Sequence, residues 1–210
     1  MTDNNIIPTS VTLDYQADEW GIERIVLDGI QNHLPSDSGG SFIGVEFEVN
    51  NRWIPYEERQ SIGLDPVSAI QFRDDGRGFD KKFLEIFAST KKPEEGSVGQ
   101  FGEGLKMLAA ACMRTNIDLE IQSRDWTAKP FVEELHLDGH TIQKMNFYHS
   151  SLPEKRIGSA TILRNPSPEL ISYVMNLEEK VLMFDKNRPR LFNTAEGSIL
   201  EGEGDIYVKG

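Results

Sequence analysis

Apolar residues recur with a helical period in two parts of the chain. Residues 18–33 (DEWGIERIVLDGIQNH) place apolar side chains at every third or fourth position, which predicts an amphipathic helix that ends before Pro35. Residues 105–114 (LKMLAAACMR) predict a second helix, which begins directly after a glycine-rich loop. Residues 168–184 indicate a third helix, and residues 83–87 indicate a short one.

Other segments show the alternating or continuous apolar pattern of strands. They are 41–49, 69–73, 117–124, 131–139, 142–149 and 159–164, with turns predicted at 125–130, 138–140 and 150–158. Residues 187–210 have the character of a hairpin. This pattern predicts an α+β fold, a two-layer α/β sandwich in which helices cover one face of a mixed, mostly antiparallel sheet. We expect the sheet around Phe42, Ile70, Leu119, Val132, Met145 and Ile162, and the helices at Ile22, Leu105 and Ile171.

Composition narrows the class of protein. The chain has 210 residues, of which 38% are hydrophobic and 27% charged, as expected for one large globular domain or slightly more. Its net charge of -12 argues against binding of DNA or RNA over a broad surface, because that binding relies on Lys and Arg to neutralise phosphates. It shows neither a long apolar run nor a leader, so we expect no membrane span and a cytoplasmic location. The single cysteine, Cys112, is expected to be a buried thiol.

Asp28 and Asn32 are four residues apart on the first predicted helix, so their side chains project from one face, one turn apart. A carboxylate and an amide there could orient a water molecule and complete the shell of Mg²⁺, which takes oxygen ligands and keeps waters and phosphates as the others. On its own, the pair fits a solvated polar helix face better.

Asp74 follows a predicted strand and begins the pattern D-x-G-x-G with Gly76 and Gly78. Its carboxylate could accept a hydrogen bond from the exocyclic amine of a base, while the two glycines let the backbone pack against a flat ring. An acidic type I turn is the alternative interpretation, and the pattern alone favours it.

The stretch 96–107 (GSVGQFGEGLKM) is a glycine-rich loop that ends at a predicted helix N-terminus. Unpaired N–H groups and the helix dipole favour phosphate at such a place. Lys106 adds one mobile positive charge. The spacing matches neither the P-loop nor the dinucleotide-binding motif, so the common nucleotide folds do not fit.

In this order and with these separations, the three motifs resemble the GHKL superfamily of ATPases, which includes gyrase-type topoisomerases, the ninety-kilodalton heat-shock chaperone, histidine kinases and MutL. The resemblance spans residues 19–163 and implies the Bergerat (HATPase) fold with ATP and Mg²⁺ as ligands. It implies that Asn32 binds Mg²⁺ and that Asp28 stands where hydrolytic members place a glutamate as general base. It also implies that Asp74 recognises the adenine amino group, with Gly76 and Gly78 lining the base.

The same resemblance assigns a lid and its phosphate-binding residues. These are Gly99, Gln100, Phe101, Gly102, Glu103, Gly104, Leu105 and Lys106, with Ser89, Thr90 and Lys91 at the lid's start. The strand 159–164 resembles the superfamily's late strand whose hydroxyl reaches adenine through water, a role that either Ser159 or Thr161 could fill.

Two departures from the family pattern stand out. Asp28 is one methylene shorter than the usual glutamate, which bears on whether it can activate water. Small residues usually follow the asparagine, but here His33, Leu34 and Pro35 do, and we interpret His33 as a helix-end residue.

The expected function is therefore Mg²⁺-dependent ATP binding with slow ATP hydrolysis, in which lid closure acts as a conformational switch and drives an ATP-dependent homodimer, as in the chaperone, MutL and MORC-like branch. A protein kinase acting on histidine or serine, and a nucleotide-sensing module without turnover, remain alternatives. We expect the ATP-binding domain over residues 1–180 and an extension over 181–210 that begins a further segment of a longer protein.

Overall fold

The computed structural model of the protein describes residues 5–15, 20–34, 44–63, 66–86, 104–185, 189–193 and 198–200. The chain divides into two compact units, Met1–Ile171 and Ser172–Gly210. The first unit contains all the predicted site residues, and its architecture determines which of them meet.

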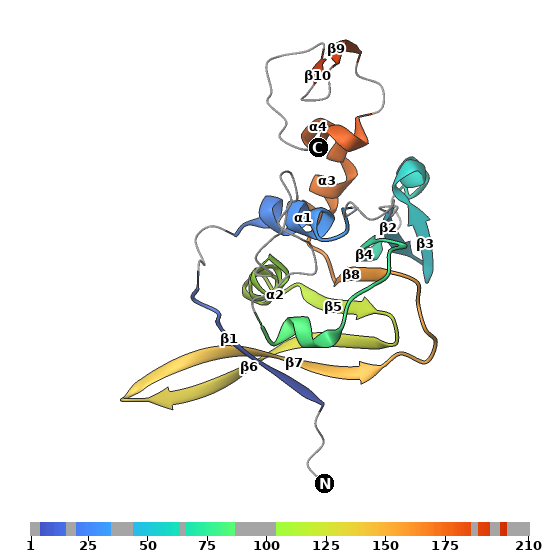
Figure 1. Ribbon diagram of the computed structural model, residues 1–210. Coiled ribbons are helices and arrows are strands. Elements are labelled where there is room, and N and C mark those ends of the chain that lie inside the picture. Colours follow the sequence, from blue (N-terminus) through green and yellow to red (C-terminus); the bar gives the residue numbers. More distant parts are fainter. Residues whose placement is uncertain are drawn as a thin grey trace. The chain divides into compact units, whose positions relative to one another are not determined.

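One eight-stranded sheet dominates the first unit (Figure 1). Its order is β1-β7-β6-β5-β8-β4-β2-β3, and every described pair of neighbours is antiparallel. The strands are β1 (Ile6–Thr12), β2 (Gly44–Val49), β3 (Arg52–Pro55), β4 (Val67–Arg73), β5 (Asp118–Ser123), β6 (Trp126–Leu137), β7 (His140–Ser151) and β8 (Ser159–Arg164).

Two α-helices pack against one face of this sheet, and two 3₁₀ helices lie in its connections (Figure 1). They are α1 (Ile22–Gln31), α2 (Gly104–Arg114), η2 (Tyr56–Ser61) and η3 (Lys81–Leu84). Gly29 lets α1 approach β4 closely, because a Cβ there would lie 2.8 Å from the Phe72 ring. Helix α2 is buried from Lys106 to Cys112, so the sheet and α1 enclose it on most sides.

Strand register decides which side chains face the helices. Thr161 of β8 lies opposite Phe72 of β4 and Ile121 of β5, so its hydroxyl shares the helix-facing side with those apolar residues. Ser159 shares that side because residues two apart on a strand face the same way. The alternate residues Ala160 and Ile162 face the other side, which we call the outer face.

The prediction of a two-layer α/β sandwich with a mixed sheet is wrong. The first unit is mostly one large antiparallel sheet, and helices make up a minor part of it. The sequence pattern missed β1 and β3 and underestimated β6 and β7, which are 12 residues long each. The Bergerat architecture that the resemblance implied is therefore wrong as well.

Several local predictions are confirmed and others need correction. The helix at 105–114 and the turn at 138–140 are present, the turn with φ of +50° at Asp138 and +79° at Gly139. The first helix is shorter than predicted, at 10 residues. The predicted turn at 125–130 is wrong, because β6 already begins at Trp126.

The second unit consists of short elements. The predicted helix over 168–184 is instead α3 (Pro168–Met175), which crosses the boundary between the units, followed by α4 (Leu177–Lys180) and the 3₁₀ helix η4 (Leu182–Phe184). Strands β9 (Arg190–Asn193) and β10 (Ser198–Leu200) pair antiparallel, which confirms the hairpin character. Among the described residues of the whole chain, no helix is long and apolar enough to cross a membrane.

Candidate functional site

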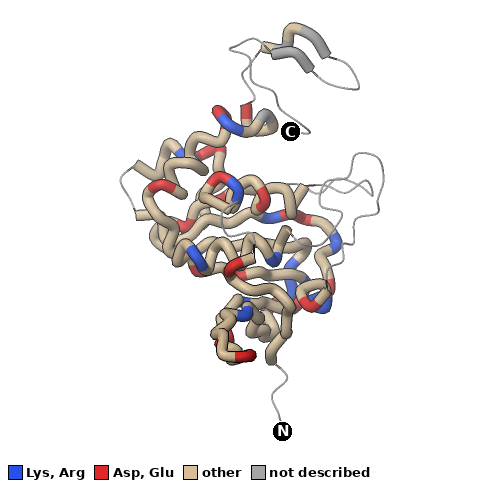
Figure 2. Tube along the Cα trace, turned by 90° about the vertical axis from the view of Figure 1, so that its left-hand side faces the viewer, with Lys and Arg blue, Asp and Glu red and all other residues tan. Residues whose placement is uncertain are grey.

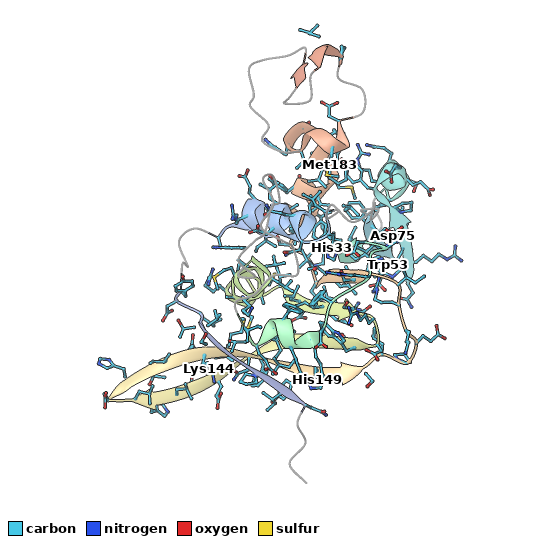
Figure 3. The ribbon with its side chains drawn as sticks, in the orientation of Figure 1. His33, Trp53, Asp75, Lys144, His149 and Met183 are labelled. Carbon is cyan, nitrogen blue, oxygen red and sulfur yellow. The ribbon has the colours of Figure 1, made fainter. Side chains whose placement is uncertain are left out.

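The last turn of α1 brings three polar residues to the sheet. Asn32 occupies the C-cap with helical dihedrals, and its N–H donates to the carbonyl of Asp28 at 3.0 Å. Asp28 and Asn32 therefore lie one turn apart on the same side of the helix, as their spacing predicts. His33 follows directly and points under the helix toward the sheet (Figure 3).

Asp28 is a buried carboxylate with one cationic neighbour. Only 4% of the residue is exposed, and Nε of Arg24 lies 2.8 Å from its Oδ2. This ion pair holds Oδ2 of the buried carboxylate. Burial raises the pKa of Asp28 above its ordinary value, and the charge of Arg24 offsets part of that rise.

Asp74 lies at the centre of a polar network just beyond the end of β4. Its Oδ2 accepts hydrogen bonds from His33 Nδ1 at 2.7 Å and from Ser159 Oγ at 2.5 Å, and its Oδ1 accepts one from the Gly76 N–H at 2.9 Å. Burial alone would raise the pKa of Asp74, but the hydrogen bonds from His33 and Ser159 outweigh it and hold the pKa below its ordinary value.

His33 connects this network to β8. Its residue is 3% exposed, and Nε2 lies 2.9 Å from Oγ1 of Thr161, which is itself 1% exposed. The interpretation of His33 as a simple helix-end residue missed this role. The available signal was its place directly after Asn32, where the resemblance has a small residue: a larger polar side chain there must find partners beneath the helix.

Two glycines make the close approach at Asp74 possible. Gly158 has φ of +75°, and a Cβ on it would lie 2.0 Å from the carbonyl oxygen of Asp74. Gly78 has φ of +65°, and a Cβ there would meet Ser123 Oγ at 2.6 Å. Gly78 thus packs against the β5–β6 turn, although we predicted that it lines a ligand ring. Sequence reasoning missed Gly158, which directly precedes the predicted strand at Ser159.

Asn32 also meets the start of α2. Its Oδ1 lies 3.7 Å from where a Cβ on Gly104 would be, and its buried Nδ2 has no hydrogen-bond partner within the described ranges. An unpaired amide N–H is a donor, so it fits a contact with a bound water or with a phosphate oxygen. Among the described residues, no group of three or more His, Cys, Asp or Glu could hold a metal ion.

Lys106 is not the mobile cation that the sequence suggested. The residue is 1% exposed, and its Nζ donates to the carbonyl oxygens of Phe83 at 3.0 Å and Ile86 at 2.6 Å. Its ammonium therefore ties α2 to the segment that follows η3. Leu105 is half-buried beside it on the first turn of α2.

The remaining predicted site residues belong to the lid. Lys91, Gly99, Gln100, Phe101, Gly102 and Glu103 lie outside the described residues, as do Ser89 and Thr90. Their assignment stays a prediction from the sequence. The described part of the site therefore consists of residues from α1, the end of β4, the start of α2 and the start of β8.

Comparisons with known proteins add no further constraint. No protein-family model matches the chain, and no curated protein matches it.

Proposed function

We propose that the chain is a Mg²⁺-dependent ATP-binding domain that hydrolyses ATP slowly. The observation that supports this most is the junction at His33, which joins Asp74 and Thr161, while the neighbouring Asn32 lies against Gly104. Residues far apart in the sequence thus lie together, His33 and Thr161 being 128 positions apart.

Asp74 is suited to recognise an amino group on a nucleobase. Its lowered pKa keeps the carboxyl ionised, and an ionised carboxylate can only accept hydrogen bonds. The hydrogen bonds from His33, Ser159 and the Gly76 N–H fix the carboxylate, so it is a rigid acceptor. Adenine offers a donor at its 6-amino group, whereas guanine has a carbonyl oxygen at the same position and would be rejected.

Asn32 and Asp28 are suited to the phosphate end of the nucleotide. Asn32 would hold Mg²⁺ through its amide oxygen, which lies beside Gly104 at the start of α2, and the ion when bound would offset phosphate charge. Asp28, one helical turn away, has a pKa that burial raises, so its carboxylate can accept a proton from a water molecule. Asp28 is therefore our candidate general base.

One observation favours a second candidate function, nucleotide sensing without turnover. Arg24 lies 2.8 Å from Asp28 Oδ2, and a carboxylate held by a guanidinium is a poorer base than a free one. A side chain one methylene shorter than glutamate also reaches less far. Release of phosphate from ATP separates the two functions, because sensing predicts binding alone.

Calorimetric titration with ATP and ADP, each with and without Mg²⁺, tests the proposed binding. We expect saturable ATP binding that strengthens with Mg²⁺, and a preference for ATP over GTP that Asp74→Asn reduces about tenfold or more, since an unpaired buried polar group costs about 1–3 kcal/mol. The control is Asp75→Asn, which changes the exposed neighbouring carboxylate (Figure 3). Absence of ATP binding, or an unchanged preference in Asp74→Asn, would refute the proposal.

A further inference from the structure

Three hydrogen bonds occupy most of the acceptor positions of the Asp74 carboxylate. An ionised carboxylate has about four acceptor positions. Two donors, His33 Nδ1 and Ser159 Oγ, lie on Oδ2, and the Gly76 N–H lies on Oδ1. Counting donors from the described residues, one acceptor position of Oδ1 remains for a ligand.

We infer that His33 is the positioning residue that sets nucleobase selectivity at this site, by holding Asp74 and Thr161 so that both present acceptors to a ring that carries an amino group. The inference builds on the proposed ATP binding. It concerns a residue that the motif resemblance leaves without a role.

The geometry of the imidazole explains why a histidine fits this position. Its two ring nitrogens point to opposite sides, so one ring can reach Asp74 beyond β4 and Thr161 on β8 together, at 2.7 and 2.9 Å. Because the carboxylate cannot donate, Nδ1 must carry the hydrogen toward Asp74. When the ring is neutral with the hydrogen on Nδ1, Nε2 is an acceptor, so the Thr161 hydroxyl donates to it and keeps only acceptor lone pairs for other partners.

Both groups that His33 fixes are thus acceptors toward the ligand. An amino group satisfies them, whereas a ring without one leaves buried acceptors unpaired, and a carbonyl oxygen at that position repels them. Specificity built on unpaired buried groups discriminates strongly against ligands that lack the donor. His33 thus makes the site select for the amino group and not for the ring as a whole.

The test compares ATP with purine riboside triphosphate, which lacks only the 6-amino group, in calorimetric titrations. We expect the wild type to prefer ATP by about tenfold, the size of one buried hydrogen bond, and His33→Ala to lose most of that preference. His140→Ala, which removes an exposed imidazole from the tip of the β6–β7 hairpin, is the matched control and should keep it.

Chemical rescue tests whether the His33 ring acts through its two nitrogens or only by filling space. Free imidazole added to His33→Ala should restore the preference, whereas pyrazole, a ring of the same size with adjacent nitrogens, should not, because it cannot reach both Asp74 and Thr161. A second measurement needs no variant: nitrogen NMR of the wild type should show the His33 ring in the Nδ1–H tautomer.

The outcomes distinguish this inference from the proposed function. If the wild type does not bind ATP, both fail together. If it binds ATP but His33→Ala keeps the preference for the amino group, or if pyrazole rescues as well as imidazole, only the role of His33 is overturned. An Nε2–H tautomer at His33 would overturn it as well.

Discussion

Strands β4 and β8 have polar side chains on both faces, and the two sets differ in length, burial and partners. On the helix-facing side, His33, Asp74 and Thr161 are short side chains that are each at most 9% exposed. On the outer face, Arg73 and Arg164 are about one-third exposed and pair with Glu46, Glu48 and Glu120. Acidic and basic positions are interspersed along the chain (Figure 2).

The difference reflects two ways of placing polar groups near a core. Long charged side chains on the outer face cover the small buried cluster of Ala69, Ala160 and Ile162 with their stems, while their charges stay near water. Short buried polar groups have no such freedom and must find partners inside the protein. The helix-facing network is therefore the more demanding arrangement, and we expect substitutions there to have the larger effects.

The largest expected effect is at Asp28. Asp28→Asn should lower the rate of ATP hydrolysis about 10²–10⁴-fold while leaving Mg·ATP binding nearly intact, because the amide cannot accept the proton of the attacking water. Phosphate release under saturating ATP measures the change. The control is Glu48→Gln on the outer face, which should hydrolyse at the wild-type rate. Equal phosphate release by wild type and Asp28→Asn would favour nucleotide sensing.

The next effect is steric and concerns the backbone under Asp74. Gly158→Ala should lower the free energy of unfolding by about 3 kcal/mol or more, since the left-handed conformation costs about 1–2 kcal/mol and overpacking about 1–3 kcal/mol. Gly139→Ala is the matched control, because Gly139 also has a positive φ of +79° but nothing lies within 4 Å of its Cβ position. Urea denaturation of both variants should show the difference, and equal losses would contradict the close approach.

Local patterns could be predicted from the sequence where neighbouring residues decide the structure. The period of α2 and the Asp138–Gly139 turn depend on contacts within a few residues, and both were predicted. Strand β1 was not predicted, and it contains Pro8, which cannot donate a backbone hydrogen bond to a neighbouring strand. Proline is tolerated at a sheet edge, and β1 lies at one, where Pro8 has Asn146 as its register partner.

The candidate site, too, could be predicted from the sequence only where local patterns decide it. Asp28, Asn32 and Asp74 could be selected by type and spacing, but the His33 bridge depends on which strand ends lie beneath α1, which no local pattern encodes. Lys106 was misjudged for a related reason. It begins a run of buried residues that continues from Met107 to Cys112. Its ammonium is therefore buried too and needs carbonyl partners.

A smaller effect is expected at Arg24, which couples the helix surface to Asp28. Arg24→Gln removes the charge that lowers the pKa of Asp28, so burial acts alone and the acid limb of the pH–rate profile should move to higher pH. The folded pKa of Asp28 lies above its unfolded value, so its contribution to stability falls as pH rises through that interval. The control is Arg52→Gln on β3, an exposed arginine. An acid limb that does not move would show that Arg24 does not tune the base.

The smallest effect is expected on the outer face, at Glu46. Its side chain accepts hydrogen bonds from Arg73, at 2.9 Å, and from Gln71, and Arg73 is 34% exposed. Because partly exposed ion pairs contribute about 0–1 kcal/mol, Glu46→Gln should change the free energy of unfolding by less than about 1 kcal/mol.

Glu46→Gln keeps one oxygen to accept from Arg73, and the buried Gln71 amide must turn over to pair with the new amide group, so the main loss is the charge. Urea denaturation at low and high salt checks this, and the difference between variant and wild type should shrink as salt screens the pair. ATP affinity should not change, although Arg73 directly precedes Asp74. A loss above about 2 kcal/mol, or weaker ATP binding, would mean that the outer ion pairs help to hold the buried network in place, and the two faces of β4 and β8 would then have to be treated as one unit.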